Sequence, residues 1–171
     1  MRITTERLTL VPISLDYLES TYAYSSDLEN THYMCYLPHD SIEETRAFIA
    51  RSMEEWAKER PACYEFSILR GECHVGGASL YMLEDGAVEL AWILDKRFWG
   101  MGYATEAARA LMAWGRDSLG VRRFIAMCDS ENVASWRLME RLGMHRIRLS
   151  GGRKNRSSVE ERQEVIYEIF F

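Results

Sequence analysis

Apolar and polar residues alternate in several stretches of the chain, and a period of two predicts β-strands. Leu8 and Leu10 alternate with polar neighbours up to Pro12, which predicts an opening strand. Three further strand-like runs follow, at about 62–70, 73–82 and 86–95. Because only short polar turns separate these runs, the pattern predicts an antiparallel meander.

Apolar residues three and four positions apart predict helices elsewhere. Ser14 is expected to cap a short helix, whose apolar face carries Leu15, Leu18 and Tyr22. Ser41 and Glu44 have the spacing of a capping box, in which each side chain accepts a hydrogen bond from the other residue's backbone N–H. The helix that they open is expected to stop before Pro61 and to carry on one stripe Ile42, Ile49, Met53 and Trp56. Residues 29–40 show no regular pattern.

After residue 95 the period changes to the helical one. A helix is expected from the spacing of Ala104, Ala107, Ala108, Leu111, Met112 and Gly115. The next elements are an alternating strand with Phe124, Ala126 and Cys128, and a helix over 132–142 that Gly143 closes. Strands near 144–149 and 164–171 end the chain, separated by an irregular polar stretch over 151–162.

These elements predict an α+β fold, with one mixed sheet flanked by helices. The chain has no internal repeat and no linker rich in Pro, Gly or Ser. A length of 171 residues is enough for one sizeable hydrophobic core. We therefore expect a single domain over residues 1–171.

Composition and charge exclude several classes of protein. The chain is 47% hydrophobic and 27% charged, which is ordinary for a globular protein. No apolar run is long enough to span a membrane, and the first residues lack the apolar stretch that a signal peptide needs, so we expect neither feature. A net charge of −5 argues against nucleic-acid binding and is compatible with a cationic amine substrate. The four cysteines and four histidines lack metal-ligand spacing, so we expect no metal and a reduced, cytoplasmic protein.

The segment over 88–106 is the one most informative about chemistry. A strand ending near residue 95 runs into a short loop with Gly100 and Gly102, and the loop runs directly into a helix. Unpaired N–H groups at a helix N-terminus attract anions, and glycines let the backbone approach phosphate oxygens closely. Arg97 adds one positive charge. The pattern indicates a phosphate site, although a plain strand-to-helix connector would have the same elements.

Two common phosphate-binding motifs fit this loop poorly. A P-loop needs a Gly-Lys-Ser/Thr ending, which is absent. A dinucleotide fingerprint needs a third glycine, where the chain has Thr105, although Asp129 does end the following strand. The match to a nucleotide-dependent oxidoreductase is therefore incomplete, and a preceding antiparallel meander also fits that fold poorly.

The loop resembles the signature of the GNAT acyltransferase superfamily, Arg/Gln-x-x-Gly-x-Gly/Ala. The matching residues are Arg97-Phe98-Trp99-Gly100-Met101-Gly102. Further segments are similar to the branch typified by the ribosomal-protein N-terminal alanine acetyltransferases. They are Glu6-Arg7-Leu8-Thr9-Leu10, Trp99 through Ala107, and Asn132-Val133-Ala134-Ser135 with Leu142-Gly143-Met144. They follow the expected order over nearly the whole chain.

The resemblance implies a GNAT fold, with a mostly antiparallel, twisted sheet that splays between its two central strands. It implies acetyl-CoA as co-substrate, with main-chain groups of Ile93 and Leu94 pairing with the pantetheine arm. The pyrophosphate would be held by the loop, whose implied contact residues are Arg97, Gly100, Met101, Gly102, Tyr103, Ala104 and Thr105. Asn132 would bond the pantetheine or thiol end, although an N-cap role explains an asparagine there equally well.

The chemistry implied is direct attack of a neutral amine on the thioester, with no acyl-enzyme. Glu89 matches the carboxylate base of many members, and its alternative is a solvated or ion-paired strand residue. Many members protonate the thiolate with a tyrosine where this chain has Met139, which cannot donate a proton. In the ribosomal-protein branch a serine is proposed for that step, and Ser135 matches it. A small residue that lets CoA approach is the alternative for Ser135.

The sequence therefore indicates an acetyl-CoA-dependent N-acetyltransferase, with a protein N-terminus or a small-molecule amine as acceptor. A non-catalytic acyl-CoA-binding or sensing domain is the second hypothesis, because Met139 replaces the usual acid. The nucleotide-dependent oxidoreductase is the third, and it predicts affinity for NAD. A homodimer is possible if the apolar end over 165–171 pairs with a neighbouring copy, but burial in its own sheet explains that segment equally well.

Overall fold

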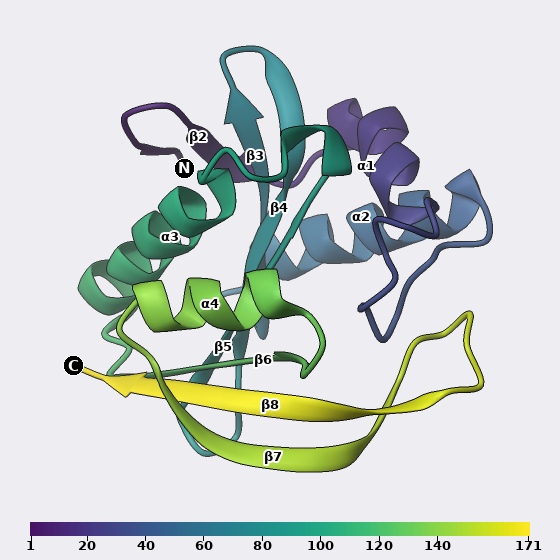
Figure 1. Ribbon diagram of the computed structural model, residues 1–171. Coiled ribbons are helices and arrows are strands. Elements are labelled where there is room, and N and C mark those ends of the chain that lie inside the picture. Colours follow the sequence, from purple (N-terminus) through teal and green to yellow (C-terminus); the bar gives the residue numbers. More distant parts are fainter.

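The computed structural model describes residues 1–171 and shows one eight-stranded sheet with helices on both faces (Figure 1). The strands are β1 (Ile3–Thr4), β2 (Thr9–Pro12), β3 (Cys63–Arg70), β4 (Cys73–Met82), β5 (Val88–Leu94), β6 (Arg123–Asp129), β7 (His145–Lys154) and β8 (Glu161–Phe170). The helices are α1 (Leu18–Ser25), α2 (Ile42–Trp56), α3 (Tyr103–Leu119) and α4 (Val133–Arg141), with short 3₁₀ helices η1 (Leu15–Tyr17) and η2 (Lys96–Phe98). None of these helices has the length and apolar character needed to cross a membrane.

The strand order is β1-β2-β3-β4-β5-β6-β8-β7, and every neighbouring pair is antiparallel except β5 with β6. These two strands pair over only two positions, Val88 with Phe124 and Glu89 with Ile125. Beyond that point β5 continues to Leu94 without a strand partner on the β6 side. The predicted α+β fold, with a mostly antiparallel sheet splayed between its central strands, is confirmed.

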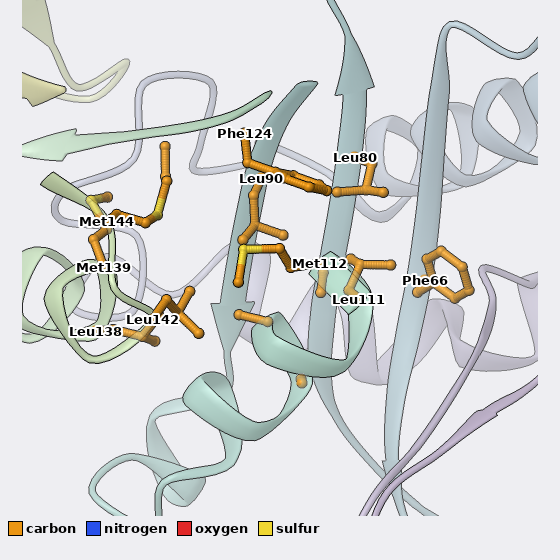
Figure 2. Close-up of a cluster of buried hydrophobic side chains, with 14 of the residues drawn as sticks. Phe66, Leu80, Leu90, Leu111, Met112, Phe124, Leu138, Met139, Leu142 and Met144 are labelled. Atoms are coloured by element: carbon orange, nitrogen blue, oxygen red, sulfur yellow. The ribbon is translucent and has the colours of Figure 1, made fainter. Parts of the chain in front are cut away.

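The sheet face under α3 and α4 holds the main hydrophobic core. Ala107 and Ala108 of α3 are completely buried, as the helical spacing predicts. Figure 2 shows the core side chains from sheet and helices together, among them Phe66, Leu80, Leu90, Leu111, Met112 and Phe124. Close packing of α3 on β4 and β5 fixes the direction in which the α3 N-terminus points.

The opposite face, under α1 and α2, is unusually polar. Glu65 of β3 is buried there and accepts hydrogen bonds from the hydroxyls of Ser79 and Tyr81 on β4. The stripe expected for α2 is partly wrong, because Met53 is exposed and the buried residues are Thr45, Ile49 and Ser52. The predicted stripe was read from apolar residues alone, and such a pattern does not reveal buried Ser and Thr residues.

Both predicted helix caps occur, with local differences. Ser14 Oγ accepts a hydrogen bond from the N–H of Asp16, so it caps η1, which leads into α1. Ser41 Oγ accepts from the N–H of Glu44 at 3.3 Å. The Glu44 carboxylate accepts from the N–H of Asp40 at 2.9 Å and not from that of Ser41, so the capping box is only half formed.

The stretch over 151–162, expected to be irregular, is mostly a β-hairpin. β7 continues to Lys154 and β8 begins at Glu161, with Arg153 opposite Arg162. Polar side chains on both strands conceal the period of two, so the pattern gives no strand signal. β8 lies between β6 and β7, and the C-terminal segment therefore has no free edge for a second copy.

Gly76 of β4 lies where β5 passes closely, and we expect Gly76→Ala to destabilise the fold. An added Cβ would meet the carbonyl oxygen of Ile93 and lie 2.8 Å from the Cα of Leu94, both backbone atoms that cannot turn aside. Such overpacking predicts a loss of at least about 3 kcal/mol, or about 6–12 °C in Tm. Thermal unfolding followed by circular dichroism checks this. Gly151→Ala, whose Cβ meets only ordinary contacts, is the control, and equal Tm values for the two variants would contradict the prediction.

Candidate active site

A cavity of about 940 Å³ opens where β5 and β6 separate. Its walls come from four parts of the chain: the end of β5, the loop from η2 to α3, α4, and the α1–α2 connection (residues 26–41). Predicted cofactor residues that line this first cavity are Ile93, Leu94, Gly100, Gly102, Tyr103, Ala104, Thr105, Asn132 and Ser135. Sequence segments far apart in the chain thus meet at one place.

The loop before α3 presents a row of free backbone donors. None of the six N–H groups of residues 100–105 has an acceptor within the chain. Gly100 and Gly102 have φ angles of +75° and +79°, a left-handed conformation that glycine adopts without strain. Gly102 is also the N-cap of α3, so the positive end of the helix dipole adds to these donors. The geometry is that of an anion site.

Arg97 was expected to contact the cofactor, and its side chain is engaged within the chain. Its guanidinium pairs with Asp95 at 2.6 Å, and its side chain is 68% exposed and does not line the cavity. Burial raises the pKa of Asp95, but hydrogen bonds from Arg97 outweigh it and hold that pKa below its usual value. Arg97 and Asp95 therefore shape the turn of η2. Met101, also predicted to contact the cofactor, does not line the cavity either.

Arg7, from the N-terminal segment, braces the loop. Its Nη1 donates to the carbonyl oxygen of Met101 at 2.9 Å, and its Nε donates to Glu106 in the first turn of α3 at 2.7 Å. The backbone N–H of Arg7 and the hydroxyl of Thr5 also donate to Glu106. These bonds lower the pKa of Glu106 although burial raises it. The sequence resemblance included Arg7 but did not reveal this role.

The hydrogen-bonding directions along β5 correct the prediction for Ile93. The N–H of Asp95 donates to the carbonyl of Val75, and the N–H of Leu83 donates to the carbonyl of Ala87, each at 3.0 Å. The main-chain N–H and C=O groups of odd-numbered residues in β5 are therefore directed at β4. The main chain of Ile93 is therefore directed at β4, and the residues facing the gap are Leu90, Trp92 and Leu94.

The carbonyl of Leu94 is already engaged within the chain. It accepts from Asn30 Nδ2 and from Trp99 Nε1, each at 3.0 Å. Asn30 is buried, and its Oδ1 accepts from the N–H of Lys96 at 2.6 Å. Asn30 therefore ties the end of β5 to the α1–α2 connection, which leaves the Leu94 N–H and the main chain of Trp92 directed at the gap.

A second cavity of about 450 Å³ adjoins the first. Four residues line both cavities, and they are Met34, Trp92, Asn132 and Ser135. Glu89 lines the second cavity only. It is half-buried and forms no hydrogen bond or ion pair within the chain. Burial, followed by the nearby charge of Glu164, raises the pKa of Glu89, against the opposing effect of Arg153.

Asn132 is the N-cap of α4, because its Oδ1 accepts from the N–H of Ser135 at 3.2 Å. Its Nδ2 donates to no group in the chain, so the cap role leaves a free donor. The Ser135 hydroxyl likewise has no partner in the chain. Met139 is buried in the core and lines neither cavity (Figure 2).

The β7–β8 hairpin holds the wall that both cavities share. Asn155 Nδ2 donates to the carbonyl oxygens of Thr31 and Met34, each at 2.7 Å, and Arg153 donates to that of Tyr33 at 3.1 Å. These contacts join two stretches whose sequences lack any periodic pattern. No local signal in the sequence indicates that they meet.

Arg137 and Arg141 of α4 also line the first cavity, and the sequence analysis missed them. Neither guanidinium has a carboxylate partner in the chain, so both positive charges are available to bind an anion. Their spacing of four residues places them on one face of α4, and this spacing is the sequence signal that could have indicated them. No group of three or more His, Cys, Asp or Glu side chains is arranged as a metal site.

Comparison with known proteins identifies the family. The family model described as acetyltransferase (GNAT) domain matches residues 7–145. The chain is 31% identical over 150 residues to the uncharacterized N-acetyltransferase YnaD of Bacillus subtilis, covering 85% of this chain and 84% of that protein. The chain belongs to the GNAT family and is an N-acetyltransferase, and its reaction is acetyl transfer from acetyl-CoA.

Solved structures agree with this fold. A GNAT-family acetyltransferase from Bacillus anthracis has a TM-score of 0.84 at 26% identity, covering 99% of this chain and 98% of that one. The ribosomal L7/L12 α-N-protein acetyltransferase RimL, in complex with coenzyme A, has a TM-score of 0.85 at 18% identity, covering 100% and 98%. The second likeness is one of fold, in keeping with the branch that the sequence resembles.

The oxidoreductase hypothesis is not supported. Parallel pairing is confined to β5 and β6, whereas a dinucleotide fold needs a parallel doubly wound sheet. Asp129 is buried and accepts from the N–H of Glu131 at 2.9 Å, with Arg162 3.7 Å away. Its carboxylate therefore stabilises the turn before α4.

Arg7→Ala is expected to weaken acetyl-CoA binding about fivefold to tenfold, because the loop of free N–H groups loses its brace. Isothermal titration calorimetry measures the Kd. Arg2→Ala, at an exposed arginine without an ion pair, is the matched control. An unchanged Kd in Arg7→Ala would show that the loop holds its shape without Arg7.

Proposed function

We propose that the chain acetylates a primary amine by direct attack of the amine on the thioester of acetyl-CoA, with Glu89 as base. One observation carries the proposal. Two cavities meet at Asn132 and Ser135, with an anion site in the first and an unpaired carboxylate in the second. A reaction between a phosphate-bearing acyl donor and a cationic acceptor needs this arrangement.

The residues of the first cavity fit acetyl-CoA. The free N–H groups of residues 100–105 suit the pyrophosphate, and Arg137 and Arg141 suit a further phosphate. The main chain of Trp92, directed into the gap, is available to pair with an extended arm bearing amides, and the N–H of Leu94 faces the same gap. Asn132 Nδ2 is a donor for the same arm.

Acetyl-CoA supplies the thioester carbonyl carbon, to which the amine nitrogen bonds as the carbon–sulfur bond breaks. Glu89 takes the proton that the acceptor ammonium loses, directly or through water. The N–H of Leu94 donates to the carbonyl oxygen as negative charge develops there. The Ser135 hydroxyl donates a proton to the departing sulfur and regains one, directly or through water, from the nitrogen as the amide forms. Leu94 lines the first cavity, Glu89 lines the second, and Ser135 lines both.

Acetyl-CoA calorimetry with NAD as control, followed by thiol release against a panel of amines, tests the proposal. The panel holds N-terminal ribosomal peptides, polyamines and aminoglycosides. We expect micromolar acetyl-CoA binding, no NAD binding, and amine-dependent thiol release. Binding without thiol release from any amine would favour the sensing domain, the hypothesis that rests on Met139 at the position of the usual acid. Absence of acetyl-CoA binding would overturn the proposal.

Glu89→Gln is expected to lower kcat by about 10²–10⁴-fold, because the amide cannot accept the ammonium proton. In the unsubstituted enzyme the rate rises with pH as Glu89 deprotonates. Since burial raises the pKa of Glu89, this rise lies at higher pH than for an ordinary glutamate. Steady-state rates across pH measure both effects. Glu72→Gln, at an exposed turn residue, is the control, and an unchanged acid limb in Glu89→Gln would assign the base elsewhere.

A further inference from the structure

The second cavity restricts the chemistry of the acceptor. We infer that the acceptor is a primary amine with a single positive charge attached to an apolar or aromatic body, either a free amine or a peptide N-terminus with an apolar first residue. The inference rests on the proposed function, because it treats the second cavity as the acceptor site.

Glu89 is the only charged residue among those that line the second cavity. Arg153 of the hairpin is not a lining residue; its two Nη groups are engaged by Glu164 and by the carbonyl of Tyr33, and only its buried Nε is unpaired. A carboxylate on the acceptor would therefore be desolvated without a cationic partner, which is costly. In this cavity one ammonium group can pair with Glu89, whereas an anionic group meets no cationic lining residue.

Among the polar groups that line this cavity, the Tyr81 hydroxyl is engaged, whereas the uncharged Asn132 and Ser135 lie where the two cavities meet. The Tyr81 hydroxyl donates to the buried Glu65 carboxylate, which also accepts from Ser79. Glu65 is itself outside the cavity lining, so it offers no second charge. The remaining wall is mostly apolar, consisting of Met34, Leu90, Ala91, Trp92, Met127 and Cys128. A second ammonium, as in a polyamine, would lose water and gain no partner.

Tyr36 provides an aromatic surface at the same cavity. Its side chain is 88% exposed although it lines the cavity, so its ring is free to contact an incoming molecule. An aromatic face attracts both an ammonium and an apolar body. The backbone near Tyr36 is held in place at Met34, whose carbonyl oxygen accepts a hydrogen bond from Asn155. The volume of about 450 Å³ lies within the range of small-molecule sites, about 300–1,000 Å³.

Matched amine pairs test the inference with acetyl-CoA saturating. Phenethylamine and phenylalaninamide are compared with phenylalanine, which adds a carboxylate, and hexylamine with 1,6-diaminohexane, which adds an ammonium. We expect kcat/KM about tenfold or more higher for the member without the extra charge. Phenylalaninamide and a peptide beginning with phenylalanine represent the peptide source, and phenethylamine the free amine. Equal or higher kcat/KM for phenylalanine or diaminohexane would overturn the inference while leaving the acetyltransferase intact.

Variants of Tyr36 test the aromatic contact separately. Tyr36→Ala is expected to raise the KM for phenethylamine about fivefold to tenfold and to leave the KM for acetyl-CoA unchanged, and Tyr36→Phe to restore the lower value. Leu28→Ala is the control, since Leu28 is also exposed in the α1–α2 connection and lines neither cavity. An unchanged amine KM in Tyr36→Ala would remove Tyr36 from acceptor recognition. Acetyl-CoA binding with no acetylation of any amine would instead overturn the proposed function, and the inference with it.

Discussion

The separation of β5 from β6 after two paired positions is the constraint on which the rest of the site depends. A fully paired sheet would bury the inward-facing main chain of Trp92 and Leu94 in hydrogen bonds and leave no gap. Because the strands part, the gap opens into two adjoining cavities, and Glu89, at the last paired position, lines the second of them. One break in hydrogen bonding therefore provides both a cavity beside the free N–H groups of residues 100–105 and an unpaired carboxylate.

The two faces of the sheet contribute differently to this site. Apolar packing of α3 on β4 and β5 holds the helix so that its N-terminus, with the free N–H groups of residues 100–105, faces the gap. On the polar face under α1 and α2, the carboxylate of Glu65 accepts hydrogen bonds from the hydroxyls of Ser79 and Tyr81. The neighbouring Glu89 has no such partners, and it remains an unpaired carboxylate in the wall of the second cavity.

Contacts between distant segments supply what the strands and α3 do not. Arg7 braces the loop before α3, Asn30 holds the end of β5, and Asn155 fixes the wall between the cavities. The wall of the second cavity at Met34 and Tyr36 is held by such a contact. It therefore depends on two stretches that show no periodic pattern, and the sequence analysis gave few expectations there. The row of free N–H groups before α3 lies on one continuous strand–loop–helix segment and was predicted more fully.

The sequence by itself determined the strands and helices of the meander, the loop with Gly100 and Gly102, and the cap residue Asn132, because each depends on local periodicity or backbone conformation. The tertiary structure alone decided that Arg97 pairs with Asp95, that Ile93 faces β4, and that the stretch over 151–162 forms a hairpin. The reason is physical. Hydrogen-bond direction follows from strand register, and an ion pair follows from which side chains the fold brings within reach, and neither property is contained in a local pattern.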